Sequence, residues 1–134
     1  MSANNERIVR ILRQAKTFFF ATVDGDQPRV RPYNAVVEYD DKVYFYTNNH
    51  KSAFKQMMTT PKIELCAQIS EDRWIRVSGK VVFDYGTEAK KAMLDANPEL
   101  RKMYSEDDKI FEVFYLSNLS AQIHSLHESP EVIC

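Results

Sequence analysis

A short polar run, Thr47 to Ser52 (TNNHKS), has the composition of a phosphate-binding loop. It follows a β-type segment and precedes a segment of helical periodicity, and free backbone N–H groups at such a junction attract phosphate. Thr47, Lys51 and Ser52 add side-chain donors. In the alternative interpretation, Asn48 or Asn49 caps the helix and Lys51 is a solvated charge. A lysine in a first helical turn opposes the helix dipole by about 0.3–1 kcal/mol, which favours a bound anion.

Two arginines alternate with other residues in a second segment, PRVRPYN, at positions 28–34. In a strand, Arg29, Arg31 and Tyr33 share one face, where they suit an anionic group or, equally, salt bridges to a neighbouring strand. Pro32 cannot donate to a sheet ladder, so we expect this strand at a sheet edge or at a bulge.

The only tryptophan lies in the segment RWIRVSG, with Trp74 and Arg76 on one face. Trp74 suits either a planar ligand or a structural contact in the core or between subunits.

The histidines and cysteines predict no metal site or disulfide. His124 and His127 are three residues apart near an expected strand end and point to opposite faces. No side chain has a clear partner for acid–base catalysis, so the catalytic residues are left unassigned, with His50 and Tyr33 as the only candidates. The two cysteines lie in unrelated contexts, which favours a reducing, cytoplasmic location.

Hydrophobic periodicity predicts the elements that hold these residues. We expect Gly79 to kink a long strand, Thr87 to cap a helix and the tail from His127 to be loose. Helices are expected at 5–16, after His50 and at 87–97, with a helical turn after Pro98. Strands are expected at 17–23, 29–39, 43–47, 62–69, 73–84, 110–116 and 120–126.

These elements predict one domain, 1–134, of mainly β (α+β) class: a six- to seven-stranded antiparallel barrel with peripheral helices. The net charge of -1 and pI near 6.3 give no overall attraction to nucleic acid or anionic lipid. The longest apolar stretch falls far short of the roughly 20 residues that span a bilayer. We therefore expect no nucleic-acid or membrane partner.

Taken in order, four blocks resemble the pyridoxamine 5'-phosphate oxidase-like family of FMN-binding split β-barrels, especially its short bacterial members. The blocks are FFFATVDGDQPRVRPYNAVVEYDDKVYFYTNNHKSAFKQM, PKIELCAQ, WIRVSGKVVFD and EVFYLSNLSAQIHS. The resemblance implies a homodimer with FMN in clefts at the subunit interface. With the arginine segment included, it predicts a cofactor site of Arg29, Arg31, Pro32, Tyr33, Thr47, Asn48, Lys51, Ser52, Trp74 and Arg76, of which Trp74 and Arg76 reach across the dimer.

The chain departs from the true oxidase, because it lacks the Ser-Arg-Lys phosphate signature and the C-terminal substrate-binding segment. The resemblance therefore implies an FMN-dependent oxidoreductase that acts on another small molecule, with NAD(P)H as a candidate electron donor. The alternative is a non-catalytic flavin-binding or redox and stress-related protein. FAD, F420 and haem remain open as cofactors, since relatives of this fold also bind them.

Overall fold

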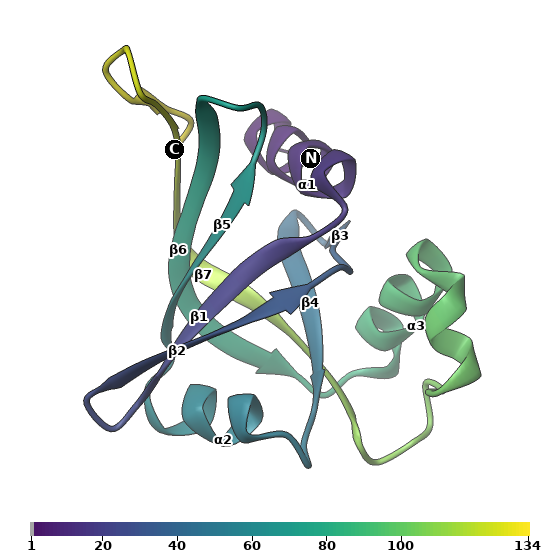
Figure 1. The fold of residues 1–134 in the computed structure, drawn as a ribbon. Helices are drawn as coiled ribbons and strands as arrows, with labels where there is room; N and C mark the ends of the chain where they lie inside the picture. Colours follow the sequence, from purple (N-terminus) through teal and green to yellow (C-terminus); the bar gives the residue numbers. More distant parts are fainter. Residues whose placement is uncertain (1) are drawn as a thin grey trace.

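The computed structural model describes residues 2–134, which form an eight-stranded antiparallel sheet with helices around it (Figure 1). This architecture confirms the predicted mainly β split barrel. In chain order the elements are α1 (Ala3–Ala15), β1 (Phe18–Asp24), β2 (Gln27–Tyr33), β3 (Val37–Tyr39), β4 (Lys42–Asn48), α2 (Ser52–Thr59), β5 (Lys62–Gln68), β6 (Arg73–Asp84), α3 (Thr87–Ala96), the 3-10 helix Pro98–Lys102, β7 (Phe111–Ser125) and β8 (Glu131–Val132).

The sheet curls until strands that are not hydrogen-bonded neighbours touch through their side chains. Its order is β2-β1-β5-β6-β7-β4-β3, with β8 paired to β7. The ring of Phe20 on β1 nevertheless lies 5.7 Å from the rings of Phe45 on β4 and Phe114 on β7, centroid to centroid. The interior of the curl is therefore a closed apolar core, in which all three rings are buried.

The helices cover separate parts of this barrel (Figure 1). Helix α1 lies at one end, α2 at the opposite end below β1 and β2, and α3 beside β4. Strand β4 is buried on both faces, because Phe45 points into the barrel while Tyr44 packs in a second apolar cluster with Met93 of α3. This double burial explains why β4 lacks a simple alternation of exposed and buried residues.

Two expectations about strands are corrected, and one about a kink is confirmed. The expected strand 29–39 is two strands, because Ala35 and Val36 are buried in the connection that carries the chain from β2 to β3, at opposite edges of the sheet. The expected strands 110–116 and 120–126 are one strand, β7, which passes through Asn118 in a left-handed conformation (φ 51°). The kink at Gly79 is confirmed by a register shift between β6 and β7.

Two further expectations about element ends are also wrong. Helix α3 has Gly86, not Thr87, at its N-cap, and no side chain caps it. The tail after His127 is not loose throughout, since Glu131–Val132 pairs with β7 and the Glu131 carboxylate accepts a hydrogen bond from Arg7 at 2.6 Å.

Candidate functional site

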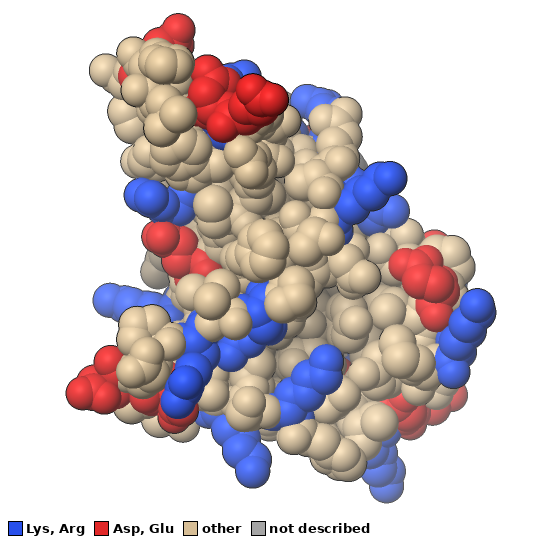
Figure 2. Space-filling view, viewed as in Figure 1, with Lys and Arg blue, Asp and Glu red and all other residues tan. Residues whose placement is uncertain are grey.

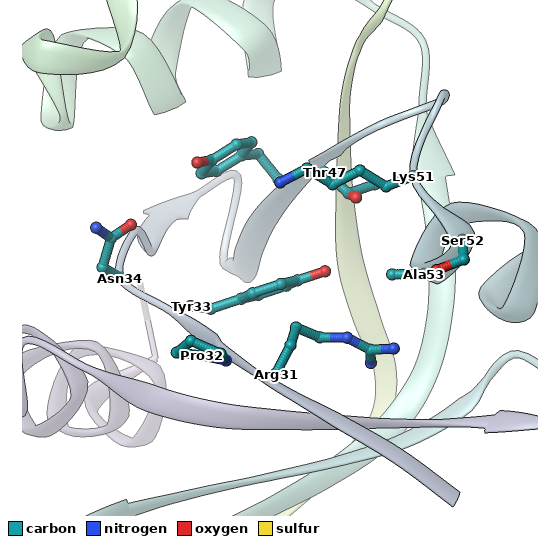
Figure 3. A pocket seen from close by; sticks show the side chains of 9 residues that line it. Arg31, Pro32, Tyr33, Asn34, Thr47, Lys51, Ser52 and Ala53 are labelled. Carbon is teal, nitrogen blue, oxygen red and sulfur yellow. The ribbon is translucent and has the colours of Figure 1, made fainter. Parts of the chain in front are cut away.

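A cavity of about 500 Å³ opens between β2, the end of β4 and the start of α2 (Figure 3). This volume lies within the range of roughly 300–1,000 Å³ that small-molecule sites occupy. Among the described residues 2–134, no acidic side chain lines the cavity, and Lys and Arg side chains gather over β2 and α2 on this face (Figure 2). The lining residues are Arg31, Pro32, Tyr33, Asn34, Tyr46, Thr47, Lys51, Ser52 and Ala53.

Arg31 brings a positive charge to the cavity without a carboxylate beside it. Its Nη1 donates to the Phe20 carbonyl at 3.1 Å and to Thr22 Oγ1 at 2.8 Å, and its Nη2 donates to Gln56 Oε1 at 3.0 Å. Within residues 2–134 it forms no salt bridge, and the same holds for Lys51. Two cations at one cavity with no acidic partner favour an anionic ligand.

The start of α2 supplies backbone donors to the same cavity. Lys51 is the N-cap residue, no side chain caps the helix, and its first turn holds no acidic residue. The N–H groups of Ser52 and Ala53 have no acceptor within the part of the chain that the structure describes. In Figure 3 the Arg31 side chain extends toward the side of the cavity where Ser52 and Ala53 lie. Cationic side chains and free N–H groups at a helix start form a site for a phosphate.

Tyr33 and Thr47 face one another across the cavity and add two hydroxyl groups (Figure 3). Both hydroxyl oxygens are buried and lack a hydrogen-bond partner in residues 2–134. Burial raises the pKa of the Tyr33 phenol, opposed by the Thr47 hydroxyl and the charge of Arg31, so the phenol is protonated at neutral pH. The Tyr33 ring stacks on Phe20, with centroids 4.7 Å apart. Buried polar atoms without partners are costly, and a polar ligand would satisfy them.

Two predicted site residues next to the cavity do not line it. Arg29 is exposed and its Nε lies 3.4 Å from the Asp24 carboxylate, as in the salt-bridge alternative. Asn48 shapes the loop, since its side-chain Nδ2 donates to the Tyr104 hydroxyl at 3.0 Å and its side-chain Oδ1 accepts from the His50 N–H at 3.1 Å. Because Asn48 and Asn49 both lie before the N-cap residue Lys51, the alternative interpretation that Asn48 or Asn49 caps the helix is wrong.

Trp74 and Arg76 lie on the outer face of β6, outside this chain's cavity. The Trp74 ring stacks on His124, with centroids 5.7 Å apart, and Arg76 Nε lies 3.4 Å from the Glu64 carboxylate. The structure therefore brings Arg31, Pro32, Tyr33, Thr47, Lys51 and Ser52 together and leaves Arg29, Asn48, Trp74 and Arg76 outside.

Sequence reasoning missed Asn34, Tyr46 and Ala53 as lining residues, and Gln56 as a partner of Arg31. Tyr46 precedes Thr47 in the aromatic strand segment VYFYT, whose composition is typical of buried core residues. A signal for Gln56 was its position four residues after Ser52, which places both on one face of α2.

Two further classes of feature are absent from residues 2–134. No helix there is long and apolar enough to cross a bilayer. No group of three or more His, Cys, Asp or Glu side chains is placed to share a metal ion in those residues.

Comparison with known proteins links the site to a family. The sequence matches the family model described as pyridoxamine 5'-phosphate oxidase over residues 5–128. A NimC/NimA family protein from Clostridium acetobutylicum is 41% identical, with a TM-score of 0.90 over 96% of this chain and 90% of that one. No curated protein matches the sequence.

Two more distant structures share the fold. A pyridoxamine 5'-phosphate oxidase-related, FMN binding protein from Nostoc punctiforme is 14% identical, with a TM-score of 0.64 over 100% of this chain and 98% of that one. A heme binding protein from Mycobacterium smegmatis is 13% identical, with a TM-score of 0.72 over 98% of this chain and 58% of that one. The family-model match over residues 5–128, which is nearly the whole sequence, leads to one conclusion: the chain belongs to the pyridoxamine 5'-phosphate oxidase family.

Proposed function

We propose that the protein binds FMN in the cavity between β2, β4 and α2 and is an FMN-dependent oxidoreductase of an unidentified small molecule. One observation carries the proposal: Arg31 and Lys51, which have no acidic partner within residues 2–134, meet the uncapped start of α2 at one cavity. This arrangement suits the FMN phosphate.

The remaining lining residues suit the rest of the flavin. Tyr33 and Thr47 offer hydroxyl groups that have no partner within residues 2–134, and the ring of Tyr33 offers a flat surface at the edge strand β2. Bound FMN would supply hydride and electron transfer, while the protein contributes binding, orientation and exclusion of water. The protonated Tyr33 phenol can hold a hydrogen bond to the ligand at neutral pH.

We further propose that the protein is a homodimer in the cytoplasm. Trp74 and Arg76 lie outside their own chain's cavity, so a role for them in flavin binding requires a second copy. Phe19 on β1 pairs with Cys66 on β5, which pairs with Arg76 on β6, so the three side chains lie on the same outer face of the sheet. Phe19 is 51% exposed and offers that face an apolar side chain for contact with a second subunit. Cys66 and Cys134 are both free, which supports a reducing compartment.

The decisive experiment is an absorbance spectrum of the purified protein, followed by titration of the apo form with FMN, riboflavin, FAD, F420 and haem. FMN binding with a preference over riboflavin supports the phosphate site, and a protein that binds haem or F420 but ignores FMN contradicts it. Light scattering on the same sample measures the mass and tests the dimer.

A non-catalytic flavin-binding protein is the second candidate, because no carboxyl or imidazole group is among the cavity's lining residues in the described chain. Steady turnover of NAD(P)H with an acceptor such as a nitroimidazole or ferricyanide supports the oxidoreductase. FMN binding without turnover supports the second candidate.

A further inference from the structure

Gln56 lies on α2 outside the cavity lining and forms hydrogen bonds with the Thr22 hydroxyl and the Arg31 guanidinium. Its Oε1 accepts hydrogen bonds from Thr22 Oγ1 at 2.5 Å and from Arg31 Nη2 at 3.0 Å. Thr22 Oγ1 in turn accepts from Arg31 Nη1 at 2.8 Å. Because a guanidinium can only donate, the amide oxygen of Gln56 must face Arg31, and the three side chains form a closed triangle.

All acceptors in this triangle are neutral. A guanidinium has five N–H donors, and the three hydrogen bonds to Phe20, Thr22 and Gln56 leave donors, including Nε–H, without an acceptor within residues 2–134. A carboxylate at the position of Gln56 would form an ion pair with Arg31 and cancel its charge at the cavity. A neutral amide orients the same guanidinium and leaves its charge uncompensated.

We propose that Gln56, together with Thr22, is a positioning residue that fixes Arg31 through neutral acceptors and so makes the cavity selective for phosphorylated ligands. The inference rests on the proposed function, because the phosphate is taken to be that of FMN. It goes beyond that function by assigning the preference for a phosphorylated over an unphosphorylated flavin to a residue that does not line the cavity.

A purely structural role is the competing explanation, since the triangle also joins β2 and β1 to α2. Loss of that link would weaken FMN and riboflavin alike, because the two ligands share the ring and the ribityl chain. Loss of charge at Arg31 weakens FMN alone. The ratio of the two dissociation constants therefore separates the explanations.

The test uses Gln56→Glu, which adds a negative charge beside Arg31, and Gln56→Met, which removes the acceptor without adding charge. Gln14→Glu is the matched control, because it makes the same charge change on an exposed residue of α1, remote in the fold from α2. Binding of FMN and riboflavin is measured by fluorescence quenching, and binding of inorganic phosphate by the shift in melting temperature.

We expect Gln56→Glu to lower the preference for FMN over riboflavin by about tenfold or more, which corresponds to about 1.4 kcal/mol. It should also abolish stabilisation by inorganic phosphate while leaving the melting temperature without ligand unchanged or raised. Gln56→Met should lower the preference less, since Arg31 keeps its charge but loses one anchor, and Gln14→Glu should match the wild type.

The failures are distinguishable. If the wild type binds FMN and Gln56→Glu keeps the wild-type preference, the inference is overturned and the proposed function stands. If the wild type ignores FMN, the proposed function fails, and inorganic phosphate decides: stabilisation of the wild type but not of Gln56→Glu supports the inference, and equal or no stabilisation of both overturns it. If Gln56→Glu does not fold, a wild-type preference in Gln56→Met overturns the inference.

Discussion

Replacing Lys51 with methionine removes one charge from the proposed phosphate site and keeps the length of the side chain. Lys51 is the exposed N-cap residue of α2 and forms no salt bridge within residues 2–134. Its removal therefore leaves no carboxylate unpaired, and we expect little change in the stability of the protein without ligand.

The magnitude follows from the exposure of the ammonium group. Two unit charges about 4 Å apart attract by about 1 kcal/mol in bulk water and about 4 kcal/mol near a protein surface. The exposed position of Lys51 favours the lower value, and a phosphate monoester carries a charge of about -1.5 to -2 at neutral pH. The expected loss is about 1.5–2 kcal/mol, which weakens FMN binding about 10- to 30-fold.

Titrations with FMN and riboflavin in low salt measure this effect. Riboflavin affinity should stay unchanged, and the difference between wild type and variant should shrink near 1 M salt, where the screening length falls to about 3 Å. The matched control is Lys55→Met, one turn further along α2 and outside the cavity lining. Equal losses for FMN and riboflavin, or equal losses in the two variants, would refute the electrostatic reasoning.

Three other predictions concern the site and the barrel. Thr47→Val removes a buried hydroxyl without a partner, so it should stabilise the protein without ligand, by about 1–3 kcal/mol at most, and weaken FMN binding. Gly79→Ala places a Cβ 2.9 Å from Leu116 Cβ and should destabilise the barrel by about 1–3 kcal/mol in urea unfolding. Burial raises the pKa of the Tyr33 and Tyr44 phenols above the ordinary 10.0. Their contribution to stability is complete below the unfolded pKa near 10.0 and is lost as the pH rises toward the folded pKa, so the free energy of unfolding should fall above pH 10.

Each of these has its own control. Thr47→Ser keeps the hydroxyl and should retain FMN binding. If Thr47→Val is less stable than the wild type, the idea that the buried Thr47 hydroxyl destabilises the protein without ligand is contradicted. A wild-type melting temperature in Gly79→Ala would contradict the predicted clash, because it would show that Leu116 on β7 moves away from the new Cβ at no cost in stability. Tyr33→Phe should flatten the decline above pH 10, and an unchanged slope would exclude Tyr33 as its source.

Much of the candidate site was predictable because its parts are local. The strand, loop and helix from Thr47 to Ser52 are contiguous, so their composition alone indicated free N–H groups beside Lys51. Alternation along β2 correctly grouped Arg31 with Tyr33. It also grouped Arg29 with them, and the structure separates that residue because it lies toward the β1–β2 turn, next to Asp24.

The errors in the fold share one cause, which is that distant contacts override local pattern. The apolar run through Ala35 and Val36 resembles strand, yet these residues fill the crossing between opposite sheet edges.

The sequence by itself determined the helices, the hairpin succession of most strands and the polar loop before α2, since these depend on residues within a few positions of one another. Only the tertiary structure decided that β2 and β4 face one cavity and that Gln56 and Thr22 hold Arg31. The physical reason is that strand order is chosen by burying the apolar side chains of the whole chain at once. The partners of each polar residue depend on that choice.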